Sequence, residues 1–275
     1  MHLLDPAPFG RILPAMVTPM KADGAVDFEA AQQLARQLVA DGADGLVVNG
    51  TTGESPTVFY PQKIELFRAV VEAVGGKASV IANVGDNCTA DTVNFAKDVA
   101  KLGVDGFMCV VPYYNKPPQE GMYQHFKTIA NAVELPIILY NIPGRCVVNM
   151  EAETTLRLAN DCENVIAVKE ASGKMDQIAT IAAAAPEGFS VYSGDDSATY
   201  DIMRLGGAGV ISTTGNVAPE RMKELVTKCA EGKWDEAWAA HEALLPLMNG
   251  LFETSNPILV KEALKLVGFP VGGVR

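Results

Sequence analysis

The chain has 275 residues, of which 48% are hydrophobic and 20% are charged, and its formal net charge is -11. This composition is typical of a globular protein with a large core, and the acidic charge argues against binding to nucleic acid or to anionic membranes. No apolar run approaches the roughly 18 residues of a membrane span. The opening segment MHLLDPAPFGRILP has no basic region ahead of an apolar one, so we expect no signal peptide and a cytoplasmic protein.

Short apolar runs alternate with amphipathic stretches along most of the chain. The first run covers residues 12–18, and a helical pattern over Asp27–Gly42 follows it, with Gly42 placed to end the helix. Similar helical patterns follow several of the later runs. The later runs are Gly45–Val48, Val80–Val84, Gly106–Val111, Ile137–Tyr140, Val165–Lys169, Ser190–Ser193 and Ala208–Ser212.

This repetition of strand and helix predicts a parallel sheet with right-handed crossovers. About eight such units in roughly 230 residues favour a closed (β/α)8 TIM barrel, whose usual size is about 250 residues. A doubly wound open sheet is the alternative, but no G-x-G-x-x-G motif follows the first strand. After Gly232 the pattern is only helical, so we predict a barrel domain over residues 1–231 and a small C-terminal helical appendage over residues 232–275.

The active site of a TIM barrel lies at the C-terminal ends of its strands, so polar residues at these positions are the candidates. At the ends of strands two, four, five, six, seven and eight these are NGTTGES (49–55), PYYN (112–115), Tyr140-Asn141 followed by Arg145, Lys169, SGDD (193–196) and STTGN (212–216).

The residues at these strand ends exclude several kinds of chemistry. The three histidines, His2, His125 and His241, lie elsewhere, which argues against Ser-His-Asp catalysis and against His-ligated metals. The few carboxylates offer no obvious pair for a divalent cation. The five cysteines are scattered without a C-x-x-C pair, which indicates reduced residues that mostly serve packing. We therefore expect neither a metal nor a cofactor.

The remaining side chains suit covalent catalysis by an amine. A lysine in a partly dry pocket has its charged form disfavoured, so the neutral nucleophile is more accessible. In that form Lys169 can condense with a ketone to an imine, which activates the neighbouring carbon for making or breaking a C–C bond. Each feature alone has an ordinary explanation, because a strand-end lysine often reaches solvent and Arg145 alone suits a surface ion pair. Their convergence at one barrel mouth favours catalysis.

Six motifs make the chain similar to a known family. In chain order they are GTTGES, PYYNKPPQEG, YNIPGR, VIAVKEASG, SGDD and GGAGVIST, and the similarity runs from about Gly10 to Gly273. On these motifs the chain resembles the dihydrodipicolinate synthase / N-acetylneuraminate lyase family of pyruvate-dependent class I aldolases. The resemblance implies a Schiff-base lyase on a TIM barrel.

The resemblance also implies roles for individual catalytic residues. Lys169 is expected to be the imine-forming lysine and Tyr140 the proton-transferring tyrosine. Thr52 is expected to act as a relay, and Tyr114 to reach in from a neighbouring subunit. This last role agrees with the homotetramer, built from tight dimers, that the family implies.

A second set of residues is implied to bind substrates. Thr51 and Thr52 are expected to hold the carboxylate of pyruvate, and Arg145 the carboxylate of aspartate semialdehyde. The backbone of Gly194 and Ile211 is expected to line the site. The Thr-Thr pair and Arg145 resemble the synthase branch of the family more than its sugar-acid lyases.

The resemblance implies condensation of pyruvate with L-aspartate 4-semialdehyde, a step of the diaminopimelate route to lysine. Two alternatives stay open: a pyruvate-releasing sugar-acid aldolase, against which Arg145 argues, and a non-catalytic carboxylate-binding protein on an aldolase barrel. The second would require loss of the imine lysine or the relay tyrosine, and both are present. One departure from the synthases is NPILVK (256–261), where Leu259 replaces a second proline.

In lysine-inhibited members of the family an allosteric pocket lies at the tight-dimer interface. By resemblance it corresponds here to Ser55, Pro56, Tyr60, Lys63, Asn87, Asp91 and Tyr113. Tyr60 and Lys63 stand where strongly regulated bacterial members carry histidines. Because a lysine is normally charged near pH 7 whereas a histidine can be neutral, we expect weak or absent inhibition by lysine.

Overall fold

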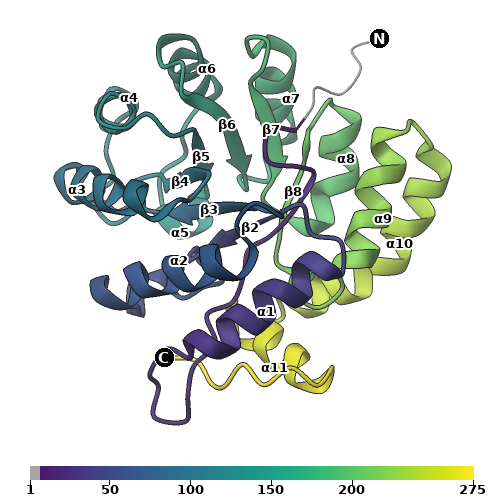
Figure 1. Cartoon of the computed structure of the whole chain (residues 1–275). Coiled ribbons are helices and arrows are strands. Elements are labelled where there is room, and N and C mark those ends of the chain that lie inside the picture. The colour runs from purple at the N-terminus through teal and green to yellow at the C-terminus, as the bar shows by residue number, and fades with distance from the viewer. Residues whose placement is uncertain (1–6) are drawn as a thin grey trace.

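The computed structural model describes residues 7–275, so His2 and the first six residues of the predicted barrel domain lie outside it. Eight parallel strands form the centre of the molecule and helices surround them (Figure 1), which confirms the predicted TIM barrel. The strands are β1 (Ile12–Pro14), β2 (Gly45–Val48), β3 (Ser79–Asn83), β4 (Gly106–Val110), β5 (Ile137–Asn141), β6 (Val165–Glu170), β7 (Ser190–Ser193) and β8 (Gly209–Ser212).

The sheet closes on itself. Its strands follow the order β1-β8-β7-β6-β5-β4-β3-β2. At the remaining seam a bridge joins Ala15 to Val47, and the Met16 N–H donates to the Val47 oxygen over 3.0 Å. Because the chain at β1 thus contacts both β8 and β2, the doubly wound open sheet is excluded.

The first strand is shorter than predicted. The apolar run of residues 12–18 indicated a strand over its whole length, but β1 has only 3 residues. Beyond it, the Val17 N–H donates to the Asn216 side chain over 3.0 Å, and the Thr18 hydroxyl donates to the Gly53 oxygen over 2.6 Å. Side-chain contacts replace strand pairing there and attach this segment to loops at the barrel mouth.

Helices follow the strands along the chain. The α-helices are α1 (Phe28–Ala40), α2 (Tyr60–Val74), α3 (Thr89–Val99), α4 (Gln119–Ala130), α5 (Pro143–Cys146), α6 (Ala152–Asp161), α7 (Met175–Ala184), α8 (Thr199–Arg204), α9 (Pro219–Ala230), α10 (Trp234–Gly250) and α11 (Ile258–Leu266). Short 3-10 helices span Ser55–Thr57, Ala100–Leu102, Asp196–Ala198 and Thr214–Asn216.

Helix α1 illustrates how local sequence sets an element. The Asp27 carboxylate accepts a hydrogen bond from the Ala30 N–H over 3.0 Å, which satisfies a donor that the start of a helix leaves unpaired. Leu34 and Leu38 lie on the buried face, one turn apart, as the pattern predicted. Gly42 follows with φ of 104°, a left-handed conformation that favours glycine.

The core has two concentric parts. One lies between the strands and the surrounding helices, and includes Leu46, Phe67, Phe107 and Leu139. The other fills the inside of the barrel with inward-facing side chains from successive strands, which include Leu13, Val47, Ile81, Met108, Ile138, Tyr140, Ala167, Tyr192 and Ile211. The barrel is therefore solid, and a substrate can bind only at its mouth.

The predicted C-terminal region is helical. Helix α10 packs against α8 and α9, whereas α11 contacts the 3-10 helix Thr214–Asn216 at the barrel mouth. Figure 1 shows α11 beside α1 at the bottom of the view, whereas α9 and α10 lie together at the right. The division into two regions at residue 231 stays a prediction.

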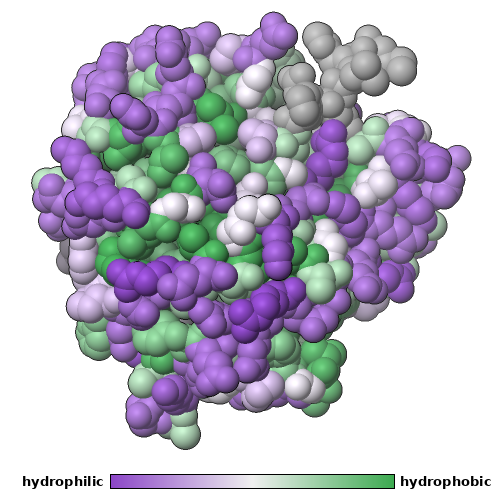
Figure 2. Space-filling model, viewed as in Figure 1, coloured by the Kyte–Doolittle hydropathy of each residue, from purple (hydrophilic) through white to green (hydrophobic). Residues whose placement is uncertain are grey.

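The view of Figure 2 shows hydrophilic side chains over most of the outer helices, with apolar residues gathered toward the middle of this face. Among residues 7–275, no helix combines the length and the apolar character that crossing a membrane requires.

Candidate active site

Lys169 and Tyr140 are brought together by strand register. They are directly paired across β5 and β6, which are neighbouring parallel strands. The Lys169 Nζ lies 4.2 Å from the centroid of the Tyr140 ring. The two residues to which sequence analysis gave the central chemistry are therefore in contact.

Lys169 is buried rather than directed to solvent. It is 5% exposed, and its ammonium forms no hydrogen bond or ion pair with another residue in the range 7–275. Burial lowers its pKa to about 8, an effect that nearby Asp196 opposes and Arg145 assists. About a tenth of a lysine with this pKa is the neutral nucleophile at pH 7, far more than of an ordinary exposed lysine.

Tyr140 is buried above the core that fills the barrel. Burial raises the pKa of its hydroxyl to about 12, while a hydrogen bond with the Thr51 side chain opposes that shift. The hydroxyl is therefore protonated at neutral pH and can donate. The Thr51 side chain, and not that of Thr52, acts on the pKa of Tyr140, and the expected relay role of Thr52 stays a prediction.

Thr52 has different partners. Its Oγ1 accepts a hydrogen bond from the Asn256 side-chain amide over 2.9 Å and lies 3.5 Å from the Thr213 hydroxyl. The loop that carries Thr52 is tightly folded, because a Cβ at Gly53 would lie 2.9 Å from the Asn49 Cα. This shortage of space explains a glycine between the threonines and Glu54.

Arg145 stands at the edge of the site on α5, directly after β5. It is exposed and forms no ion pair with any residue from 7 to 275. Its Nη2 donates to the Asn256 backbone oxygen over 3.4 Å. A cationic fork with free donors at a barrel mouth suits recognition of a carboxylate.

A cavity of about 550 Å³ connects these groups. Thr51, Tyr140, Arg145 and Asn256 line it. Lys169 is not among its lining residues, but the Tyr140 ring, which its Nζ contacts, is. The cavity is therefore large enough for a small acid next to the Tyr140 hydroxyl and the Arg145 guanidinium.

Gly194 and Ile211 do not line this cavity, and their role in lining the substrate site stays a prediction. The Gly194 N–H donates to the Glu170 oxygen over 2.7 Å, and a Cβ at this position would lie 3.1 Å from the Lys169 Cγ. Glycine thus leaves room for the lysine side chain. Ile211 pairs with Leu13 on β1 and lies in the barrel interior.

Tyr114 does not join the other predicted residues within one chain. It is 87% exposed, has a positive φ of 70°, and does not line the cavity. The preceding residue, Tyr113, does line it. An exposed tyrosine in a left-handed conformation on the loop after β4 is positioned by the backbone to project from the chain.

Sequence analysis gave no role to three contributors, although Asp196 stood among the candidates in SGDD (193–196). Asp196 is 3% exposed, and its Oδ2 accepts the N–H groups of Thr213 and Thr214 over 3.1 and 2.7 Å. Burial raises its pKa. The other two are Asn256 and Lys261, which belong to the NPILVK motif that was noted for Leu259 alone. The available signal was that both residues are polar although the sequence at the start of this helix is otherwise mostly apolar.

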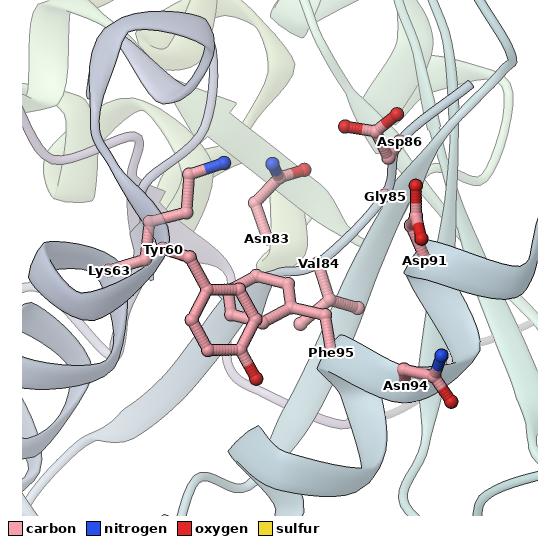
Figure 3. A pocket seen from close by; sticks show the side chains of 9 residues that line it. All are labelled: Tyr60, Lys63, Asn83, Val84, Gly85, Asp86, Asp91, Asn94 and Phe95. Atoms are coloured by element: carbon pink, nitrogen blue, oxygen red, sulfur yellow. The ribbon is translucent and has the colours of Figure 1, made fainter. Parts of the chain in front are cut away.

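The residues predicted for regulation lie around two adjoining cavities. Tyr60, Lys63 and Asp91 line a cavity of about 210 Å³, in which Figure 3 shows the Lys63 side chain and the Asp91 carboxylate on opposite sides. Ser55, Pro56 and Tyr113 line the larger cavity, and Lys63 lines both. Asn87 lines neither, but its amide donates to the Tyr113 oxygen over 3.2 Å.

The electrostatics of the smaller cavity depend on Lys63. Burial lowers the pKa of this lysine, and the nearby Asp86 carboxylate opposes the shift. Tyr60 is engaged elsewhere, because its hydroxyl donates to the Asp98 carboxylate over 2.6 Å and its ring packs against Phe95. Lys63 is thus the basic side chain among the residues that line this cavity.

Known proteins resemble this chain over nearly its whole length. Residues 8–275 match the family described as the dihydrodipicolinate synthetase family. The 4-hydroxy-tetrahydrodipicolinate synthase of Symbiobacterium thermophilum is 53% identical over 97% of this chain and 91% of its own, and that of Moorella thermoacetica is 55% identical with the same coverage.

A solved structure shows the same fold. The dihydrodipicolinate synthase of Cyanidioschyzon merolae, crystallised with lysine bound, superposes with a TM-score of 0.95 at 46% identity, over 97% of this chain and 91% of that one. A family match over almost all residues, together with relatives above half identity, establishes the classification. The chain belongs to the dihydrodipicolinate synthetase family.

Proposed function

We propose that this protein is a class I aldolase that condenses pyruvate with L-aspartate 4-semialdehyde to 4-hydroxy-tetrahydrodipicolinate, in the diaminopimelate route to lysine. The observation that carries the proposal is the buried Lys169 amine against the Tyr140 ring, with the unpaired Arg145 guanidinium on the same cavity. Relatives above half identity carry the name of this synthase.

The first half of the reaction uses Lys169. Its neutral amine attacks the keto carbon of pyruvate, and loss of water gives a protonated imine. The imine withdraws electrons, so the methyl carbon loses a proton to the Tyr140 phenolate that remains after the water has left, and an enamine forms. The Tyr140 hydroxyl, in contact with Thr51, supplies the proton that converts the carbinolamine hydroxyl into leaving water.

The second half forms the C–C bond and releases the product. The enamine carbon attacks the aldehyde carbon of the second substrate, and the new alkoxide takes a proton from the tyrosine relay. The amine of that substrate then attacks the imine carbon, closes the ring and displaces Lys169. Arg145 holds the carboxylate of the semialdehyde, while Thr52 and the adjacent N–H groups hold that of pyruvate.

Turnover with defined substrates tests the proposal. Purified protein should consume pyruvate and aspartate semialdehyde at rates far above those of pyruvate release from sugar acids. Arg145→Ala should mainly raise KM for the semialdehyde, because a charge-assisted carboxylate contact is lost. Unchanged kinetics in this variant would contradict the assignment of substrate, and cleavage of a sugar acid would replace it.

We also propose that the active unit is a homotetramer of tight dimers in the cytoplasm. The exposed Tyr114 supports an active site that two subunits share, since its side chain projects from its own chain. Mixing Tyr114→Phe with Lys169→Ala subunits should restore activity, because a mixed dimer contains one site with both side chains. No recovery after demonstrated subunit exchange would contradict the shared site.

The cavity of Figure 3 supports a further proposal, that lysine inhibits this enzyme weakly. A lysine ligand brings two ammonium groups, and Lys63 lines both adjoining cavities. Burial lowers the pKa of Lys63, which weakens the repulsion between its ammonium and those of the ligand, and the nearby Asp86 carboxylate opposes that shift. The relative from Cyanidioschyzon merolae, crystallised with lysine bound, provides a lysine-binding comparison.

A further inference from the structure

Asn256 contacts both halves of the substrate site. It lies directly before α11 and is 9% exposed. Its side-chain amide donates to the Thr52 Oγ1 over 2.9 Å, and its backbone oxygen accepts from the Arg145 Nη2 over 3.4 Å. One residue therefore connects the threonine that we propose holds pyruvate with the arginine that we propose holds the semialdehyde.

Lys261 holds the same loop from the first turns of α11. Its Nζ lies 2.5 Å from the Glu54 Oε1, and these side chains are 1% and 6% exposed. The second Glu54 oxygen accepts the Arg275 N–H over 2.8 Å, and Lys261 also donates to the Gly273 oxygen over 2.7 Å. The ion pair is thus buried and hydrogen-bonded on both sides.

The loop needs such support because its backbone is unusual. Glu54 has φ of 57°, a left-handed conformation that residues with a side chain rarely adopt. On its other side the loop is attached to the segment that follows β1, because the Thr18 hydroxyl donates to the Gly53 backbone oxygen. Asn256 and Lys261 provide the opposing attachment.

We propose that Asn256 and Lys261 form a clamp that fixes the Thr51–Glu54 loop for catalysis, and that Asn256 is a positioning residue for the pyruvate end of the site. The inference rests on the proposed function. Because the Asn256 amide donates to the Thr52 oxygen, the Thr52 hydroxyl proton points away from Asn256, and a pyruvate carboxylate would compete for it with the Thr213 hydroxyl 3.5 Å away. The clamp therefore orients a donor and holds its loop.

Truncation of the Asn256 side chain distinguishes an effect on pyruvate binding from an effect on semialdehyde binding. Asn256→Ala removes the amide but keeps the backbone oxygen that meets Arg145. KM for pyruvate should rise roughly tenfold, the equivalent of one hydrogen bond, while KM for the semialdehyde stays within about twofold of the wild-type value. Asn256→Asp keeps the shape without the amide donor and should show the same loss.

A matched asparagine at the other end of the barrel serves as the control. The Asn164 amide donates to the Ala130 and Val133 oxygens over 3.0 and 2.9 Å, before β6 begins. Asn164→Ala should lower the melting temperature without changing either KM. An increase in KM for pyruvate in this control as large as in Asn256→Ala would reduce Asn256 to a general structural role and overturn the proposal.

The ion pair is tested by removing both charges together. Lys261→Met alone leaves Glu54 charged and unpaired in the interior, so the double variant Glu54→Gln/Lys261→Met is used to keep the fold. It should raise KM for pyruvate at least threefold. Lys265→Met, which breaks the surface pair with Glu262 on the same helix, should leave KM unchanged.

A readout that does not need turnover separates this inference from the proposed function. The pyruvate concentration that half-saturates borohydride trapping on Lys169 should rise in Asn256→Ala and in the double variant. If wild-type protein traps pyruvate but does not turn over aspartate semialdehyde, the proposed function fails and the clamp is still measured. Half-saturation at the wild-type concentration in both folded variants would overturn the clamp.

Discussion

Lys169 shows how position changes the chemistry of one side chain. An exposed lysine is charged at neutral pH, but burial at the end of β6 lowers its pKa to about 8. The pattern of apolar runs was enough to predict from the sequence that this lysine lies at the barrel mouth. The absence of an ion-pair partner among residues 7–275 and the contact with Tyr140 depend on β5–β6 register, which a single sequence does not state.

This pKa gives the enzyme a defined pH dependence. Only the neutral amine attacks pyruvate, so the rate of imine formation should rise as pH increases through about 8 and then level off. Quenched-flow mass spectrometry from pH 6 to 10 measures it. A rate that keeps rising to the ordinary lysine pKa of about 10.4 would contradict the effect of burial.

Tyr140 is expected to matter through its hydroxyl alone. Tyr140→Phe keeps the ring against Lys169 but removes the proton donor, so kcat should fall by about 10²–10⁴-fold with an unchanged melting temperature. Steady-state kinetics and thermal unfolding check this together. A loss below about threefold would exclude Tyr140 as the relay. Thr51→Val should then reveal whether its contact with Tyr140 contributes.

At the scale of elements, the sequence predicted which strands exist better than it predicted where each strand begins and ends. All eight strands were located because buried parallel strands are continuous apolar runs. The run of residues 12–18 was misjudged, since contacts with Asn216 and Gly53 replace strand pairing. The contacts of Asn256 with Thr52 were missed for a similar reason: they join segments separated by 204 residues.

The start of α1 offers a local test of element stability. Asp27→Ala removes the carboxylate that accepts from the Ala30 N–H and should lower the free energy of unfolding by about 1 kcal/mol. Asp27→Asn keeps an acceptor and is the matched control, with a smaller loss expected. Urea denaturation measures both. Equal losses in the two variants would show that capping is not the cause.

At the scale of the whole molecule, the proposed weak inhibition by lysine depends on Lys63, a residue outside the catalytic set. A fixed cation about 4 Å from a ligand ammonium costs roughly 1–4 kcal/mol, so Lys63 should weaken lysine binding by one or more orders of magnitude. Activity across a lysine titration should therefore show little inhibition below millimolar concentration. Lys63→His should raise the sensitivity.

A lysine on the neighbouring helix controls for that substitution. Lys97 is exposed on α3 and lines neither cavity, so Lys97→His should leave the titration unchanged. Strong inhibition of the wild-type protein at sub-millimolar lysine would refute the proposal. The sequence identified this pocket only by resemblance, because its walls come from α2, α3 and the loop after β3.

The most direct test of the mechanism is covalent trapping of pyruvate. Incubation with pyruvate and borohydride should reduce the imine, inactivate the enzyme irreversibly and add one pyruvate-derived group to Lys169, as located by peptide mass spectrometry. Lys169→Ala should neither be labelled nor turn over. An adduct on another lysine, or near-wild-type activity in Lys169→Ala, would contradict the assignment of Lys169 as the nucleophile.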